Sequence, residues 1–265
     1  MPAGATRASL SLALATPGTA WLDLLQFYDI SPRIAARAEP DGSFAVELES
    51  YMDDAELRYT LDGSEPTARS ALYTGPFEVT RTTPVRCAVL RDGQTVAFSE
   101  VTLHRHDAAG RFLDLRFPAS PRYPAAGPES LVDGRLGGTD FRDGNWQGFE
   151  EVDLDAVVDL GRDTAIQSVS ARFLQSFPSW IWLPRQVSYY TSADGRRYEL
   201  LGRVLNDVPQ NQDGLFARDF TLAGLSATAR FLRVHAESVG QCPPWHAGAG
   251  GKAWLFVDEI QVNPR

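Results

Sequence analysis

The sequence PRQVSYYTSADGRRYELLGRV, at residues 184–204, decides the fold class of this chain. Its two apolar stretches, 187–191 and 198–204, are rich in β-branched and aromatic residues, which favour strands. Between them lies Asp194-Gly195, a residue pair that suits the left-handed backbone of a tight hairpin turn. The stretch therefore predicts two antiparallel strands joined directly, with no helix between them.

The same pattern of short strands and turns extends in both directions along the chain. Upstream, apolar and polar residues alternate in three segments, and turn residues such as Asp62-Gly63 and Asp92-Gly93 follow them; the segments are 44–48, 57–61 and 85–89. Downstream, further strands are expected at 156–160, 166–174, 216–221, 231–236 and 254–262. Helical apolar spacing occurs only at 21–28. We therefore expect an all-β protein made of two antiparallel β-sandwiches.

Composition shifts divide the chain into segments. Residues 105–130 contain four prolines at 118–128, a density that central strands do not tolerate, so we place a linker and the edge of the next domain there. The expected division is a leader or upstream remnant with a short helix at 1–29, a first sandwich at 30–104, this linker, and a second sandwich at 131–263.

The net charge argues against nucleic acid as a partner, and the hydropathy argues against a membrane-spanning helix. The chain carries a formal net charge of −9 with no basic stripe, which disfavours nucleic acid. No apolar run approaches the ~20 residues that a membrane-spanning helix needs.

The first 20 residues contain a short apolar stretch followed by Pro17, which makes an unconvincing secretory signal. Cys87 and Cys242 lie far apart without metal-ligand spacing, and two free thiols are expected.

In the first half, the sequence LRYTLDGSEP at 57–66, followed by Ser70, Tyr73 and Pro76-Phe77, resembles a known module. It is the fibronectin-III-like module that occurs at the carboxyl end of chitobiase and β-N-acetylhexosaminidase chains. The resemblance covers about 30–104.

The second half resembles the discoidin domain, also called the coagulation-factor-five/eight type C domain. The matching motifs are LVDG at 131–134, WQGF at 146–149, VVDLG at 157–161, the stretch at 184–195, ARFLRV at 229–234 and DEI at 258–260. In detail the chain is similar to the tails of bacterial family-20 β-N-acetylhexosaminidases. The resemblance implies an accessory region, because those enzymes carry their chemistry in a separate barrel. It also implies a secreted, periplasmic or cell-surface location.

Two long segments between expected strands, 175–185 and 241–252, are the candidate sugar-binding loops. Indole rings stack on the apolar face of a sugar, and polar side chains pair with its hydroxyl groups. The candidate residues are Trp180, Trp182, Arg185, Trp245, His246, Gln175, Asn145 and Lys252. The alternative is that Trp180 and Trp182 cap the core. We assign Trp146 and Trp254, which are not candidates, to the core. We expect the two loops to meet at one end of the second sandwich.

The discoidin resemblance also implies a structural calcium ion. Asp133, Thr139 and Glu259 match the positions that supply its oxygen ligands, and Asp140 could substitute. The alternative is an Asx-turn at Asp133 and a solvated Glu259. His104 and His106 form an H-x-H pair without a visible third ligand, and we expect both to be solvated.

No catalytic residues are assigned. The adjacent pair Asp258-Glu259 falls in an expected strand, where neighbouring side chains point to opposite faces, whereas glycoside hydrolysis needs two facing carboxyl groups. The first hypothesis is a non-catalytic pair of modules that targets a glycoside hydrolase to a glycan of galactose or N-acetylhexosamine type. The second is the carboxyl-terminal part of a β-N-acetylhexosaminidase-like hydrolase, with a catalytic glycosidase domain as partner. The third is a structural or adhesion protein whose loops contact other proteins.

Overall fold

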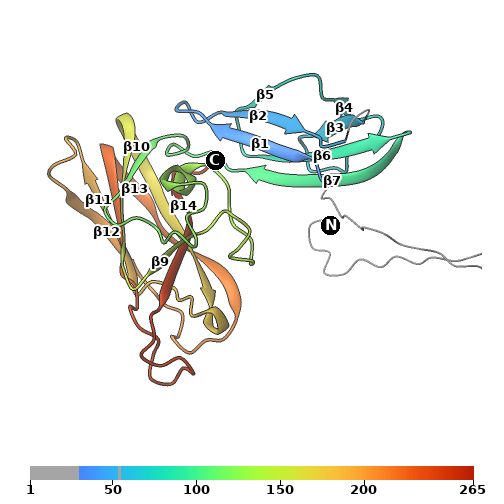
Figure 1. The fold of residues 1–265 in the computed structure, drawn as a ribbon. Helices are drawn as coiled ribbons and strands as arrows, with labels where there is room; N and C mark the ends of the chain where they lie inside the picture. Colours follow the sequence, from blue (N-terminus) through green and yellow to red (C-terminus); the bar gives the residue numbers. More distant parts are fainter. Residues whose placement is uncertain (1–29, 53–54) are drawn as a thin grey trace, which may run out of the picture. The chain divides into compact units, whose positions relative to one another are not determined.

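A computed structural model describes residues 30–52 and 55–265 (Figure 1). The helix and leader expected at 1–29 lie outside the described residues. The chain divides into two compact units, with the main boundary between residues 101 and 102; segments 37–45 and 78–83 group with the second unit. No helix in the described ranges is long and apolar enough to cross a membrane.

The first module, residues 30–103, contains two antiparallel sheets. One has the order β1-β2-β5 and the other β4-β3-β6-β7. The strands are β1 Arg33–Ala38, β2 Phe44–Glu49, β3 Glu56–Thr60, β4 Ala71–Leu72, β5 Phe77–Val79, β6 Thr83–Arg91 and β7 Gln94–Leu103. The predicted alternation is confirmed, because Phe44, Val46 and Leu48 are buried on β2. Asp92 and Gly93 both adopt positive φ in the predicted turn between β6 and β7.

The second module, residues 104–265, is built on one long path of strands. Its sheet has the order β12-β11-β13-β10-β14-β9, and β8 pairs with β10. The elements are β8 Phe112–Leu115, η1 Pro128–Val132, β9 Gln147–Glu150, β10 Leu154–Ser176, η2 Phe177–Ser179, β11 Gln186–Ser192, β12 Glu199–Leu205, β13 Leu215–Ala236 and β14 Trp254–Val262. The hairpin predicted around Asp194-Gly195 joins β11 and β12, as expected.

Strands β10 and β13 form a ribbon that folds over on itself. Residues 154–159 pair with 231–236, and 168–176 pair with 215–223, while register shifts interrupt the ladder between them. The first part of β10 also pairs with β8, whereas its last part pairs with β14. The ribbon thus contributes to two layers. The sequence predicts two separate strands at 156–160 and 166–174, but the structure joins them in one bent strand, β10.

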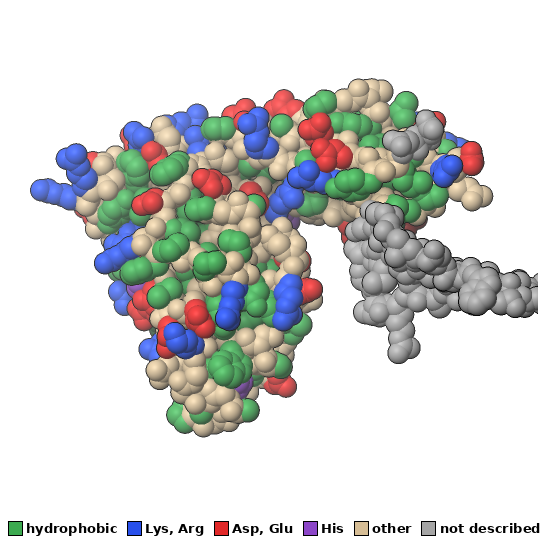
Figure 2. Space-filling view, in the orientation of Figure 1, with side chains coloured by type: hydrophobic (Ala, Val, Ile, Leu, Met, Phe, Trp, Pro, Cys, Tyr) green, Lys and Arg blue, Asp and Glu red, His purple; other side chains and the backbone are tan. Residues whose placement is uncertain are grey.

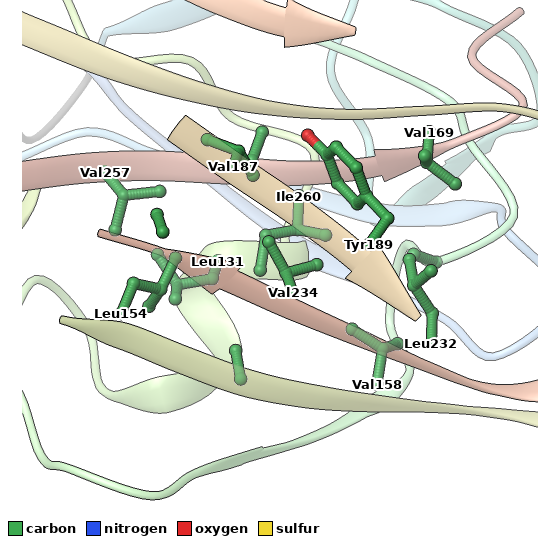
Figure 3. Close-up of a cluster of buried hydrophobic side chains, with 14 of the residues drawn as sticks. Leu131, Leu154, Val158, Val169, Val187, Tyr189, Leu232, Val234, Val257 and Ile260 are labelled. Carbon is green, nitrogen blue, oxygen red and sulfur yellow. The ribbon is translucent and has the colours of Figure 1, made fainter. Parts of the chain in front are cut away.

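The core of the second module lies between these two layers. Figure 3 shows Val158, Val187 and Val234 from one layer near Val169 and Ile260 from the other, and all five are buried. The hydroxyl group of Tyr189, on β11, donates a hydrogen bond to the carbonyl oxygen of Phe220 in the opposite layer. A satisfied hydroxyl allows this large ring to sit in the core without an unpaired polar group.

The expected linker is partly a strand. Residues 112–115 of the proline-rich segment form β8, and Leu113 is buried in the core. The prolines lie after β8, at 118–128, so they do not interrupt its pairing with β10.

Candidate binding site

The ends of the long strands bring several loops together at one end of the second module. The Glu151 amide, just before β10, donates to the Ala253 carbonyl at 2.9 Å. Just after β10, the Trp182 amide donates to the Trp254 carbonyl, also at 2.9 Å. Because residues 253 and 254 are adjacent, both ends of β10 lie at the start of β14. The loops 177–185 and 237–253 therefore meet, and Figure 2 shows hydrophobic side chains exposed at this end.

Trp180 lies on the surface with a glycine backing. Its backbone is left-handed at φ 61°, its side chain is 40% exposed, and its amide donates to the Phe177 carbonyl. A methyl group added at Gly248 or Gly251 would come within 2.7 Å of the indole ring. The ring thus rests against backbone where only glycine leaves room, while the rest of it faces solvent.

Trp245 is the second exposed ring, at 50% exposure. It packs edge-on against Phe177 and Trp182, with ring centroids 5.6 Å apart in both cases. The half-buried His246 lies 5.9 Å from Trp245, and its Nδ1 accepts a hydrogen bond from the Gly248 amide at 3.0 Å. We call Trp180 and Trp245 the ring platform.

Trp182 is buried, which agrees with the alternative that this ring caps the core and not with an exposed stacking surface. Its side chain is 2% exposed and packs with Phe177, Cys242 and Ala253. The left-handed turn at Trp180 breaks the regular alternation, and this backbone detail directs one Trp outward and the other inward. Trp146 and Trp254 are buried, as predicted.

A cavity of about 220 Å³ lies on another side of Trp182. Trp182, Gln175 and Arg185 line it, together with Asn206, Val208 and Gln210 from the loop between β12 and β13, which sequence reasoning did not select. Gln175 is buried, and its Nε2 donates to the Gln212 carbonyl at 2.7 Å. The Asn-Asp-Val-Pro-Gln composition of 206–210 is typical of a surface loop and gives no sign of a site.

Asn145 and Lys252 are not among the residues that line this cavity. Lys252 is exposed and forms an ion pair with Glu151 at 2.9 Å. Asn145 is half-buried, and its amide donates to Asp143 at 2.9 Å. Neither contributes a described contact to the ring platform.

A larger cavity of about 380 Å³ lies at the corner end of the folded ribbon, beside Arg162, Thr164 and Asn263. Its lining contains no aromatic residue, so it offers no surface on which a ring could stack. The loop end is therefore the better candidate site.

The predicted metal ligands are only partly brought together. Asp133 and Glu259 interact electrostatically, and the Gly134 amide donates to Glu259 Oε1 at 3.3 Å. Asp133 also accepts a hydrogen bond from the Arg135 amide, so the expected Asx-turn is present. Thr139 and Asp140 are exposed, with no described contact to either carboxyl group. Among the described residues, no three His, Cys, Asp or Glu side chains form a metal-binding group.

His106 is buried, which corrects the expectation of a solvated side chain, and burial of Glu259 contradicts the alternative in which this residue is solvated. Glu259 is fully buried, and its Oε1 lies 2.8 Å from His106 Nε2. Burial lowers the pKa of His106 to about 3, so this imidazole is neutral at physiological pH. Burial, reinforced by Asp133 and Asp258, raises the pKa of Glu259 well above its ordinary value. His104 is half-buried, and burial lowers its pKa.

Asp258 and Glu259 are both held inside the protein. Asp258 Oδ2 accepts a hydrogen bond from the Gly137 amide at 2.7 Å and pairs with Arg172. Burial raises the pKa of Asp258 to about 7, and Arg172 opposes that increase. Their contacts, Arg172 for one and His106 for the other, are structural ones, in keeping with neighbours on opposite faces of a strand.

Solved structures similar to this chain have low sequence identity. The module CpGH89CBM32-5 from Clostridium perfringens, in complex with GalNAc-β-1,3-galactose, is 16% identical, with 57% of this chain and 94% of that chain covered and a TM-score of 0.35. A Streptococcus pneumoniae fucose binding module is 14% identical, with 66% and 98% covered and a TM-score of 0.42. Chitosan-binding module 2 of a Paenibacillus sp. IK-5 chitosanase/glucanase, in complex with chitotriose, is 16% identical, with 59% and 98% covered and a TM-score of 0.37. Since all three TM-scores are below 0.5, the function of the second module is argued from its own residues.

A search of curated proteins finds no match. Residues 40–102 match the family model described as Chitobiase/beta-hexosaminidase C-terminal domain. The match confirms the resemblance predicted from LRYTLDGSEP. Residues 40–102 of the first module are thus similar to the chitobiase/β-hexosaminidase C-terminal domain.

Proposed function

We propose that the second module binds carbohydrate through its loop end and serves as a non-catalytic accessory to a glycoside hydrolase. The observation that carries this proposal is the ring platform: Trp180 rests against Gly248 and Gly251, Trp245 packs on Phe177 and Trp182, and the two residues are 40% and 50% exposed. Large exposed rings in one region mark interaction surfaces, because leaving them in water is unfavourable.

Sugars suit this surface because one face of a pyranose ring consists of C–H groups, while its edge carries hydroxyl groups. An exposed indole can cover the C–H face, and His246, whose ring lies 5.9 Å from that of Trp245, can meet hydroxyl groups. Covering one indole contributes on the order of 1–3 kcal/mol. The affinity for a single sugar is therefore expected to be modest.

The accessory role follows from the first module, whose family is named for hexosaminidases. We infer that a catalytic domain acts beside this chain, and that the preferred glycans are of galactose or N-acetylhexosamine type. Secretion or display at the cell surface is the setting in which such an accessory would meet glycans.

The test is a glycan array on the full chain, followed by titration of the best glycan against Trp180→Ala and Trp245→Ala. Each variant should bind about tenfold more weakly and melt close to the parent. Phe112→Ala is the matched control, because Phe112 is an exposed ring on β8 near the corner end. Equal binding by both Trp variants would contradict the proposal, as would binding only to a glycosidase domain, which would favour a protein-contact role.

Calcium is a further part of this proposal. Glu259 Oε2 is buried without a hydrogen-bond partner, and a cation between Glu259 and Asp133 would satisfy it. These two carboxyl groups, with backbone carbonyl oxygens, would hold the ion, and Thr139 would have to move toward them to take part. The ion would neutralise buried negative charge and stabilise the module.

A further inference from the structure

We infer that the cavity beside Trp182 accepts a sugar residue bearing a carboxylate, and that Arg185 is the residue that recognises it. This inference rests on the proposed glycan binding and deepens it by naming a substrate class. The cavity is separate from the exposed faces of Trp180 and Trp245, neither of which lines it. Trp182 connects the two, since its ring contacts Trp245 and also forms part of the cavity wall.

The size of the cavity suits one monosaccharide. Its volume of about 220 Å³ equals roughly seven water molecules at about 30 Å³ each in the liquid. Trp182, Leu183 and Val208 provide an apolar wall, while Arg185 and Asn206 provide polar groups. This combination of an apolar wall with a few polar groups is typical of small-molecule sites.

Arg185 and Asn206 supply donor groups to the cavity, and none of its lining residues is Asp or Glu. Arg185 Nη2 donates to the Val239 carbonyl at 3.0 Å, and no described ion pair includes Arg185. Asn206 uses Oδ1 to accept a hydrogen bond from the Val208 amide at 3.0 Å, which leaves its amide nitrogen as a donor. In a chain with a net charge of −9, an acid-free cavity with a guanidinium group is a local exception.

The backbone holds these donors in place. The Arg185 amide donates to the Glu237 carbonyl at 2.8 Å, and the Asn206 amide donates to the Arg185 carbonyl at 3.0 Å. Arg185 is therefore fixed between the end of β13 and the end of β12. A guanidinium group has further N–H groups arranged to grip both oxygens of a carboxylate, which is the anion that a uronic acid residue presents.

The experiment compares two matched pairs of probes on the full chain at low ionic strength. Methyl glucuronide is compared with methyl glucoside, and methyl galacturonide with methyl galactoside; within each pair only the carboxylate differs from a CH₂OH group. NMR titration should show at least fivefold tighter binding of the acid in one pair. Arg185→Gln should remove that preference, and 0.5 M salt should reduce it. Arg203→Gln, an exposed arginine on β12 outside the cavity lining, should retain it.

Equal affinity for acid and neutral sugar in both pairs would overturn the inference, and so would a preference that survives in Arg185→Gln. If neutral glycans bind in a Trp180- and Trp245-dependent way without any acid preference, the inference fails and the proposed function stands. If the acid binds through Arg185 while both Trp variants are unaffected, the ring platform is wrong and the cavity assignment stands. Absence of binding by all four glycosides and by the array would overturn both.

Discussion

Two regions of the second module depart in opposite ways from the rule that polar groups lie outside and apolar groups inside. The polar cluster of His106, Asp258 and Glu259 is buried, whereas the ring platform of Trp180 and Trp245 is exposed. Each buried carboxyl group has one oxygen bonded and the other without a partner, Asp258 Oδ1 and Glu259 Oε2.

Each ring of the platform is likewise covered by protein on one side and exposed to solvent on the other. Trp180 is supported on one side by the backbone at Gly248 and Gly251, and Trp245 packs edge-on against Phe177. Unmet polar groups inside and unmet apolar surface outside both cost free energy. A partner would satisfy each region: a cation would suit the first, and an apolar surface would suit the second.

The largest effect is expected for Trp182→Ala. Removing this buried ring should lower the free energy of unfolding of the second module by about 3–5 kcal/mol, because a cavity opens between Phe177 and Cys242. Trp245→Ala, at 50% exposure, should cost much less. Urea unfolding of the two variants checks the contrast. Similar losses of unfolding free energy in the two variants would show that Trp245 is as much a part of the core as Trp182.

Arg172→Met should have the next largest effect, about 3 kcal/mol, because it leaves Asp258 buried without its cation. Asp258→Asn in the same background should recover part of the loss by removing the charge that was left unpaired. Chemical denaturation measures both variants. A loss below 1 kcal/mol for Arg172→Met would indicate that this pair is dispensable.

Calcium should raise the stability of the second module by an amount set by its affinity, about 2.7 kcal/mol at one hundred times Kd. Melting curves with saturating calcium and with chelator check this. Glu259→Gln should abolish the difference between the two curves. Identical curves for the parent chain, with no metal found in the purified protein, would show that Glu259 and Asp133 bind no calcium.

Gly248→Ala should have the smallest effect, about 1–2 kcal/mol, because its methyl group would approach the Trp180 ring to 2.7 Å and displace it. The same substitution in a Trp180→Ala background should be nearly neutral, which makes a double-mutant cycle the measurement. Glycan affinity should fall with the displaced ring. Equal costs in both backgrounds would show that Gly248 does not support the platform.

Local patterns predicted most of the strands. Phe44, Val46 and Leu48 show the alternation of a half-buried strand, and Asp194-Gly195 shows a hairpin, because both signals depend on neighbours in sequence. The sequence did not reveal that 156–160 and 166–174 belong to one strand. Gly161 adopts positive φ within β10, and a glycine at such a position is also the ordinary sign of a turn.

The candidate site was predictable in its loops but not in its side chains. Segments rich in Trp and Pro indicated 175–185 and 241–252, and the structure brings them together. Whether Trp180 or Trp182 faces outward depends on one left-handed residue, which composition does not encode. His106 was expected to be solvated because no third ligand was visible; its partner, Glu259, lies 153 positions away in the sequence.

The folded ribbon of β10 and β13 separates the parts of this module that could be exchanged from those that could not. The four ends of these two strands lie at the loop end, and their corners lie at the opposite end beside Asn263, which accepts a hydrogen bond from the Gln167 amide. Loop 206–214 and the exposed or half-buried residues 244–252 could therefore be lengthened, shortened or grafted without altering the strand pairing of the ribbon. For a protein engineer, the module is a scaffold with one variable end, in which a new recognition surface could be selected from a loop library.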